Sequence, residues 1–141
     1  MSELRYTLLT DGPTDEVLVP VLSWLLSKYL PETAIQAQWA DLWKLPDRPK
    51  DLSERMRVAV ELFPCEVLFV HRDAERDPPE ARLLEIQQAV AAVRLSVPHL
   101  CVIPVRMMEA WFLFDAAAIR RAAGNPNGDM PLDLPDARRV E

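Results

Sequence analysis

The sequence predicts a single α/β domain with a mainly parallel four-stranded sheet and helices on both faces. The chain has 141 residues, of which 50% are hydrophobic and 27% charged, so it can bury one core of ordinary size. Short apolar runs alternate with helical stretches in the order β-α-β-α-β-α-β-α, which is typical of parallel sheets. The run EVLFVH at 66–71 is almost continuously apolar, as expected of a parallel strand that is covered on both faces.

In the first half of the chain, we expect strands at 4–10 and 34–43. The turn-forming residues DGPTD at 11–15 follow the first strand, and Thr14 can cap a helix that runs to about residue 29. The expected buried residues of this helix are Leu18, Leu22, Leu25 and Leu26. A loop at 45–50 contains two prolines, and the capping box Asp51-x-x-Glu54 opens a helix that ends before Pro64.

In the second half, the strand at 66–71 leads into a charged loop at 72–77, and Asp77 can cap the next helix. The apolar stripe of that helix is Leu83, Ile86, Val90 and Val93. A fourth strand is expected at 100–105, where Pro104 favours an edge position. A last helix is expected at 107–123 with Gly124 as its stop signal, which gives a domain at 1–124 and an irregular tail at 125–141.

Composition excludes several classes of protein. No apolar run reaches the roughly 18 residues of a membrane-spanning helix, and the start has no signal-peptide pattern, so we expect a cytoplasmic protein without membrane contact. Cys65 and Cys101 are isolated, which favours reduced, buried thiols over a zinc site. The net charge of −6 argues against extensive non-specific binding to phosphates. Basic residues do gather locally, at Lys44, Arg48, Lys50, Arg55 and Arg57, where a solvated surface is the simpler interpretation.

Acidic residues follow three of the four expected strands. Asp11 and Asp15 come after the first strand, His71, Asp73 and Glu75 after the third, and Glu109 after the fourth. In open α/β sheets, binding sites form outside the carboxyl ends of the strands. Carboxylates packed together repel one another, and a hard divalent ion such as Mg²⁺ relieves that repulsion. This pattern therefore predicts a metal site at one edge of the sheet.

Three segments resemble motifs of toprim domains. The run Thr10-Asp11-Gly12-Pro13-Thr14-Asp15 is similar to the first motif, and Val70-His71-Arg72-Asp73 is similar to the Asp-x-Asp motif. The run 104–115, PVRMMEAWFLFD, resembles a Glu-Ala-Trp-x-Leu-x-Asp signature in a toprim-like family of uncharacterised bacterial proteins. That family is related to the toprim domains of overcoming-lysogenisation-defect nucleases and is often associated with ATPases, in some cases in phage defence.

The resemblance implies a toprim-like fold and a metal-dependent, nuclease-like activity on phosphodiester bonds. It implies that Asp11, Asp73 and Glu109 are the catalytic residues and that they hold Mg²⁺ or Mn²⁺ together with His71. Asp15 and Glu75 are further candidates. The implied partners are DNA or RNA and an ATPase.

Two residues depart from the family pattern. Asp11 is one methylene shorter than the usual glutamate, and His71 replaces the first aspartate of Asp-x-Asp, where imidazole suits Mn²⁺ or Zn²⁺ better than Mg²⁺. The alternative function is therefore a toprim-like interaction module that has lost its chemistry and serves as the partner of an ATPase. With only three glycines, neither a P-loop nor a dinucleotide-binding fingerprint can be written in this sequence.

Overall fold

A computed structural model of the chain describes residues 2–104 and 115–134. Its elements in chain order are β1 (Ser2–Leu9), the 3-10 helix η1 (Pro13–Val17), α1 (Leu18–Tyr29), β2 (Thr33–Trp39), the 3-10 helix η2 (Leu42–Lys44), α2 (Leu52–Leu62), β3 (Val67–His71), α3 (Pro79–Val93), β4 (His99–Val102) and α4 (Ala116–Ala122). This order repeats the alternation of strands and helices that the sequence predicts, and it confirms the α/β class.

The four strands form one sheet in the order β2-β1-β3-β4, and every neighbouring pair is parallel. Leu8 of β1 pairs with Trp39 of β2 on one side and with Phe69 of β3 on the other. The chain moves outward from β1 to β2 and then crosses back to β3. The boundary between β1 and β3 is therefore the point where the strand order reverses, which is where open α/β sheets form their binding crevice.

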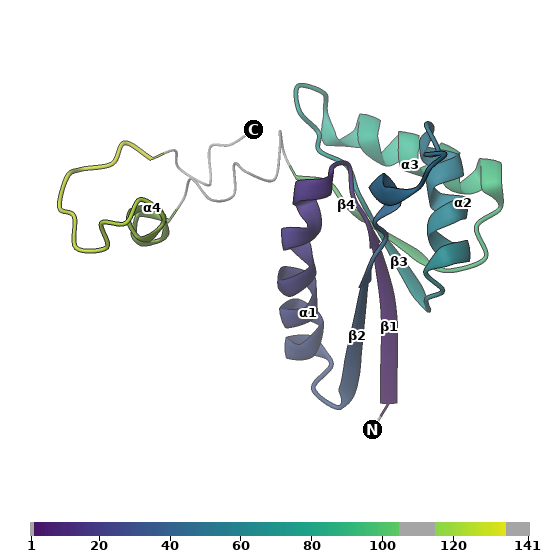
Figure 1. Ribbon diagram of the computed structural model, residues 1–141, viewed down its shortest axis with the longest axis horizontal. Helices are drawn as coiled ribbons and strands as arrows, with labels where there is room; N and C mark the ends of the chain where they lie inside the picture. Colours follow the sequence, from purple (N-terminus) through teal and green to yellow (C-terminus); the bar gives the residue numbers. More distant parts are fainter. Residues whose placement is uncertain (1, 105–114, 135–141) are drawn as a thin grey trace.

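Three helices cover the sheet in two layers, with α1 on one face and α2 and α3 on the other (Figure 1). Because strand side chains alternate between faces, the central strands β1 and β3 each contribute buried residues to two separate cores. The buried core under α1 consists of Tyr6, Leu8, Leu18, Leu22 and Phe69. The buried core under α2 and α3 consists of Leu9, Ala40, Leu42, Met56, Ala59, Leu68, Val70, Ile86 and Ala89.

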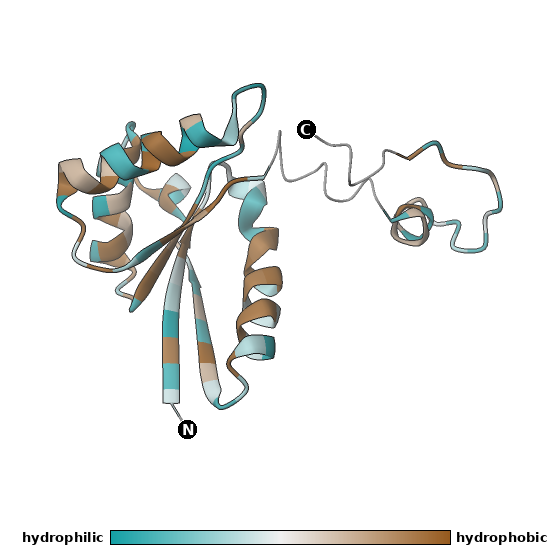
Figure 2. Cartoon of the chain, turned by 180° about the vertical axis from the view of Figure 1, so that it is seen from behind, coloured by the Kyte–Doolittle hydropathy of each residue, from teal (hydrophilic) through white to brown (hydrophobic). Residues whose placement is uncertain are grey.

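Two leucines that the sequence places in the core are exposed instead. Leu25 of α1 is 41% exposed and Leu83 of α3 is 39% exposed. The face of α1 that packs on the sheet carries Leu18, Leu22 and Leu26, and Leu25 lies beside this stripe. The outer side of α1 remains apolar, with Trp24 61% and Tyr29 70% exposed. Figure 2 shows the resulting hydrophobic colour along much of this helix.

Several of the expected element ends differ from the structure. The second strand ends at Trp39 rather than at residue 43, because a tight turn follows and leads into η2. Thr14 lies inside η1, whose first cap position is Gly12. Asp77 does not cap α3, which begins after Pro78; its carboxylate lies 3.3 Å from Arg82 instead.

Other local predictions are confirmed. Asp51 caps α2 by accepting the Glu54 N–H at 2.8 Å, and β4 lies at the sheet edge, although it ends at Val102, two residues before Pro104. The last helix begins only at Ala116, since Asp115 has an extended backbone and accepts the Ala118 N–H at 3.1 Å; residues 107–114 of the expected helix lie outside the described residues. Cys65 and Cys101 are free thiols, but they are half-buried rather than buried.

Residues 125–134 form no helix or strand, and residues 135–141 of the expected tail lie outside the described residues. In the described ranges 2–104 and 115–134, every helix is too short or too polar to cross a lipid bilayer.

Candidate metal centre

The alternation of side chains along β3 sends its last residues to opposite faces of the sheet. Phe69 faces α1, and His71, two residues later, faces the same side and is 1% exposed. Val70 faces the other side, and Arg72 follows it toward α3, where its guanidinium lies 2.9 Å from Glu85. The end of β3 thus places the His71 imidazole on the α1 side of the sheet and the Arg72 guanidinium on the α3 side.

The turn after β1 brings a carboxylate to the same place. The Thr10 hydroxyl donates to the Gly12 carbonyl at 2.8 Å, and the Gly12 N–H donates to Asp15 Oδ2 at 2.9 Å. A Cβ at position 12 would lie 3.3 Å from Asp15 Oδ2, so glycine allows this close approach. Asp15 is consequently 4% exposed and held at the start of η1, directly beside His71.

Asp15, His71 and Asp73 form a group that could hold a metal ion. One ligand atom from each residue lies within 4.8 Å of the others. His71 Nδ1 is 3.6 Å from Asp15 Oδ2, and His71 Nε2 is 3.0 Å from Asp73 Oδ1. Asp15 and His71 are buried and Asp73 is half-buried, so bulk water screens these charges weakly. Two carboxylates and one imidazole are ligands that suit a divalent transition metal.

A backbone hydrogen bond favours one tautomer of the neutral His71 ring. The Asp11 N–H donates to His71 Nδ1 at 3.1 Å, so this nitrogen carries the lone pair. In the neutral ring, the proton then lies on Nε2 and is donated to Asp73 Oδ1. For Nε2 to bind an ion instead, the proton must move to Nδ1, which ends the hydrogen bond from the Asp11 N–H, and Asp15 Oδ2 at 3.6 Å is the carboxylate that could then accept from Nδ1. Asp15 is therefore placed to orient the ring, while His71 and Asp73 offer the ligand atoms.

Asp11 lies beside this group but is bonded to other partners. Its carboxylate accepts hydrogen bonds from the Arg72 guanidinium and from the Asp73 N–H, the latter at 3.1 Å. It thereby ties the end of β1 to the loop after β3. The sequence suggests Asp11 as a metal ligand. In the described geometry its carboxylate pairs with Arg72, and the group that could hold a metal consists of Asp15, His71 and Asp73.

Arg82 on α3 supports the same loop. Its Nε donates to the Asp73 carbonyl at 3.0 Å, and its Nη1 lies 3.1 Å from Glu85. The hydrogen bond with Glu85 raises the pKa of the Arg82 guanidinium. Sequence reasoning missed Arg72, Arg82 and Glu85. The available signals were the position of Arg72 between two expected ligands and the spacing of Arg82 and Glu85, one helical turn apart on α3.

The remaining candidates take different positions. The Glu75 side chain is 64% exposed, and its carboxylate lies 3.9 Å from Arg82, outside the group. Glu109 lies outside the described residues. Of the six residues that the sequence suggests, the structure therefore brings together Asp15, His71 and Asp73, with Asp11 adjacent.

Comparison with protein-family models, curated proteins and solved structures finds no match to this chain. The structure itself establishes an α/β fold with a four-stranded parallel sheet and, at the carboxyl ends of the central strands β1 and β3, an aspartate–histidine–aspartate group that could bind a metal.

Proposed function

We propose that this chain is a divalent-metal-dependent phosphodiester hydrolase of the toprim-like kind. The observation that carries the proposal is the Asp15–His71–Asp73 group at the point where the strand order reverses. The segments that resemble the first and second toprim motifs supply all three of these residues. A metal bound there would polarise a phosphate oxygen and lower the pKa of bound water.

In this proposal the chain's own residues divide the work. His71 and Asp73 hold the ion, Asp15 orients the imidazole, and Arg72 neutralises Asp11 so that the carboxylates can pack together. The nitrogen ligand favours Mn²⁺ over Mg²⁺, because Mg²⁺ prefers oxygen ligands.

The first test is calorimetric titration of Mn²⁺ into wild-type protein and into Asp73→Asn. We expect saturable binding by the wild type and roughly 10- to 100-fold weaker binding by the variant, because one ligand loses its charge. Asp77→Asn is the matched control, since it makes the same change in the same loop at a carboxylate that faces Arg82. Circular dichroism should show that both variants are folded.

The second test is cleavage of a labelled nucleic acid. Cleavage should require Mn²⁺ and fall with Asp73→Asn but not with Asp77→Asn. A folded wild type that binds no Mn²⁺ at millimolar concentration would contradict the proposal.

The alternative is an interaction module that has lost its chemistry and serves as the partner of an ATPase. One observation favours it: polar atoms of the group already have hydrogen-bond partners within the protein. Both ring nitrogens of His71 have partners, and Asp11 is bonded to Arg72 and to the Asp73 N–H. For such a module we expect Asp73→Asn to lower stability while metal binding is absent from both proteins.

A further inference from the structure

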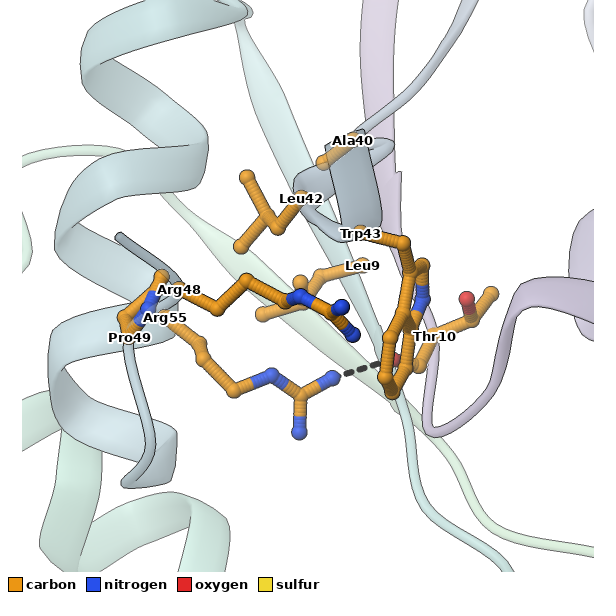
Figure 3. A pocket seen from close by; sticks show the side chains of 8 residues that line it. All are labelled: Leu9, Thr10, Ala40, Leu42, Trp43, Arg48, Pro49 and Arg55. Atoms are coloured by element: carbon orange, nitrogen blue, oxygen red, sulfur yellow. Dashed lines mark hydrogen bonds between the residues drawn. The ribbon is translucent and has the colours of Figure 1, made fainter. Parts of the chain in front are cut away.

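A recess lies beside the candidate metal centre, between the end of β1 and the start of α2. An inner cavity of about 30 Å³ is lined in part by Thr10, Trp43, Arg48 and Arg55 (Figure 3). An adjoining outer recess of about 510 Å³ shares Trp43, Arg48 and Arg55 and adds Lys50. The inner cavity admits about one water molecule, whereas the outer recess has room for a phosphate group and the sugar that carries it.

The recess concentrates positive charge in a chain whose net charge is −6. Its lining includes Arg48, Lys50 and Arg55 and a single carboxylate, Asp47. Two further basic residues of this region are already neutralised, because Lys44 pairs with Asp41 and Arg57 with Glu54 and Glu61. Among residues 2–104 and 115–134, the three cations of the recess form no ion pair, and Arg55 has only a longer-range attraction to Asp11 and Glu85, so Arg48 and Lys50 above all can meet an anion.

Arg55 is fixed where an anion would meet it. Its guanidinium donates to the Thr10 carbonyl at the end of β1, which uses only part of its donor capacity. Burial lowers the pKa of this guanidinium, and the nearby Asp11 opposes that effect. In Figure 3 the guanidinium groups of Arg48 and Arg55 both point toward Trp43 and Thr10. Two cations that face one space repel each other, and an anion between them would remove that repulsion.

Trp43 adds an aromatic surface to this charge. The indole is 37% exposed, and the Arg48 guanidinium lies 5.6 Å from its ring centroid. Cationic grooves with exposed aromatic rings bind single-stranded nucleic acids, because the cations contact phosphates and the rings stack on bases.

From these observations we propose that the recess binds a phosphate of a single-stranded nucleic acid through Arg48, Lys50 and Arg55, with a base stacked on Trp43. The inference rests on the proposed function in one respect: it treats the bound strand as the substrate of the metal centre. Thr10 links the recess to the candidate metal centre. Its carbonyl accepts a hydrogen bond from Arg55, and the next residue, Asp11, lies beside the Asp15–His71–Asp73 group.

The test is fluorescence anisotropy with a fluorescein-labelled single strand of about 12 nucleotides, in EDTA so that no metal contributes. We expect the double variant Arg48→Gln/Lys50→Gln to bind at least about 10-fold more weakly and to show a shallower dependence on salt. Arg57→Gln is the control, since it removes a cation of α2 that is already paired with Glu54 and Glu61. Quenching of tryptophan fluorescence that is lost in Trp43→Leu would support stacking.

Several outcomes would overturn the inference. They are absence of binding by the wild type, an equal loss in Arg57→Gln, or competition by inorganic phosphate as effective as that by unlabelled strand. Mn²⁺-dependent cleavage that is unchanged in the double variant would contradict substrate binding at the recess and leave the proposed function intact. Strand binding that depends on Arg48 and Lys50, in a protein that binds no Mn²⁺, would instead contradict the proposed function alone.

Discussion

Arg72 joins the two sides of the candidate site. Its guanidinium contacts Asp11 after β1 and Glu85 on α3, and its side chain is only 18% exposed. Its Nε is buried and has no hydrogen-bond partner among the described residues. Without this cation, Asp11 would lie beside Asp73 without its ion-pair partner, so the packing of the carboxylates depends in part on Arg72.

Replacement of Arg72 should therefore weaken the fold. We expect Arg72→Met to lower the free energy of unfolding by about 1–3 kcal/mol, because it removes the ion-pair partner of Asp11 and one of the two arginine partners of Glu85. Arg57→Met also removes an arginine with two carboxylate partners, but these pairs lie on the exposed face of α2 and the change should have little effect. Urea unfolding of both variants measures the difference. Equal losses would show that Arg72 has no special role.

At the scale of an element, α2 shows how a local pattern defines a helix start. Asp51 accepts hydrogen bonds from the Ser53 hydroxyl at 2.6 Å and from the Glu54 N–H at 2.8 Å. These bonds, that from Ser53 first, lower the pKa of Asp51 below its ordinary value. Because the pKa is lower in the folded state, the charge of Asp51 stabilises the protein above the ordinary aspartate pKa. This contribution is lost as the pH falls through the lowered value.

The cap gives a pH-dependent prediction. Asp51→Ala should lower the Tm by a few degrees at neutral pH, and its difference from wild type should shrink as the pH falls through the range in which Asp51 is protonated. Asp51→Asn keeps an acceptor for the Glu54 N–H and should lose less at neutral pH. Thermal denaturation followed by circular dichroism between neutral pH and acid checks this. A constant difference across the range would mean that the charge of Asp51 does not contribute.

At the scale of the whole molecule, the strand order determines which backbone is protected. β1 and β3 each have a neighbouring strand on both sides, whereas β2 and β4 form the edges. The central strands also end in the most buried residues of the sheet, including Leu8, Leu9 and Val70. We expect this centre to open only with global unfolding.

Hydrogen exchange can test this arrangement directly. Amides of Tyr6–Leu9 and Leu68–His71 should exchange more slowly than those of β2 and β4, because both neighbours of each central strand must separate before they are exposed. Mass spectrometry of peptic fragments at neutral pH measures the rates. Equal protection of an edge strand and a central strand would contradict the strand order.

Local patterns in the sequence predict much of this architecture. The apolar runs and helical stretches give the α/β class, since strand and helix periodicity are properties of adjacent residues. The Asp51 cap is predicted for the same reason, because its acceptor and donor are three residues apart. The positions of Asp15, His71 and Asp73 at strand ends also follow from the alternation of elements, so the sequence alone makes these three residues candidates.

Only the tertiary structure decides how those candidates are used. The order β2-β1-β3-β4 places β1 beside β3, and the pleat of β3 separates His71 from Arg72. As a result Arg72 pairs with Asp11, and Asp15 rather than Asp11 joins the group that could hold a metal. The sequence by itself determines which elements form, because that depends on near neighbours. Which carboxylate meets the cation depends on contacts between residues some 60 positions apart, as in the pair of Asp11 with Arg72.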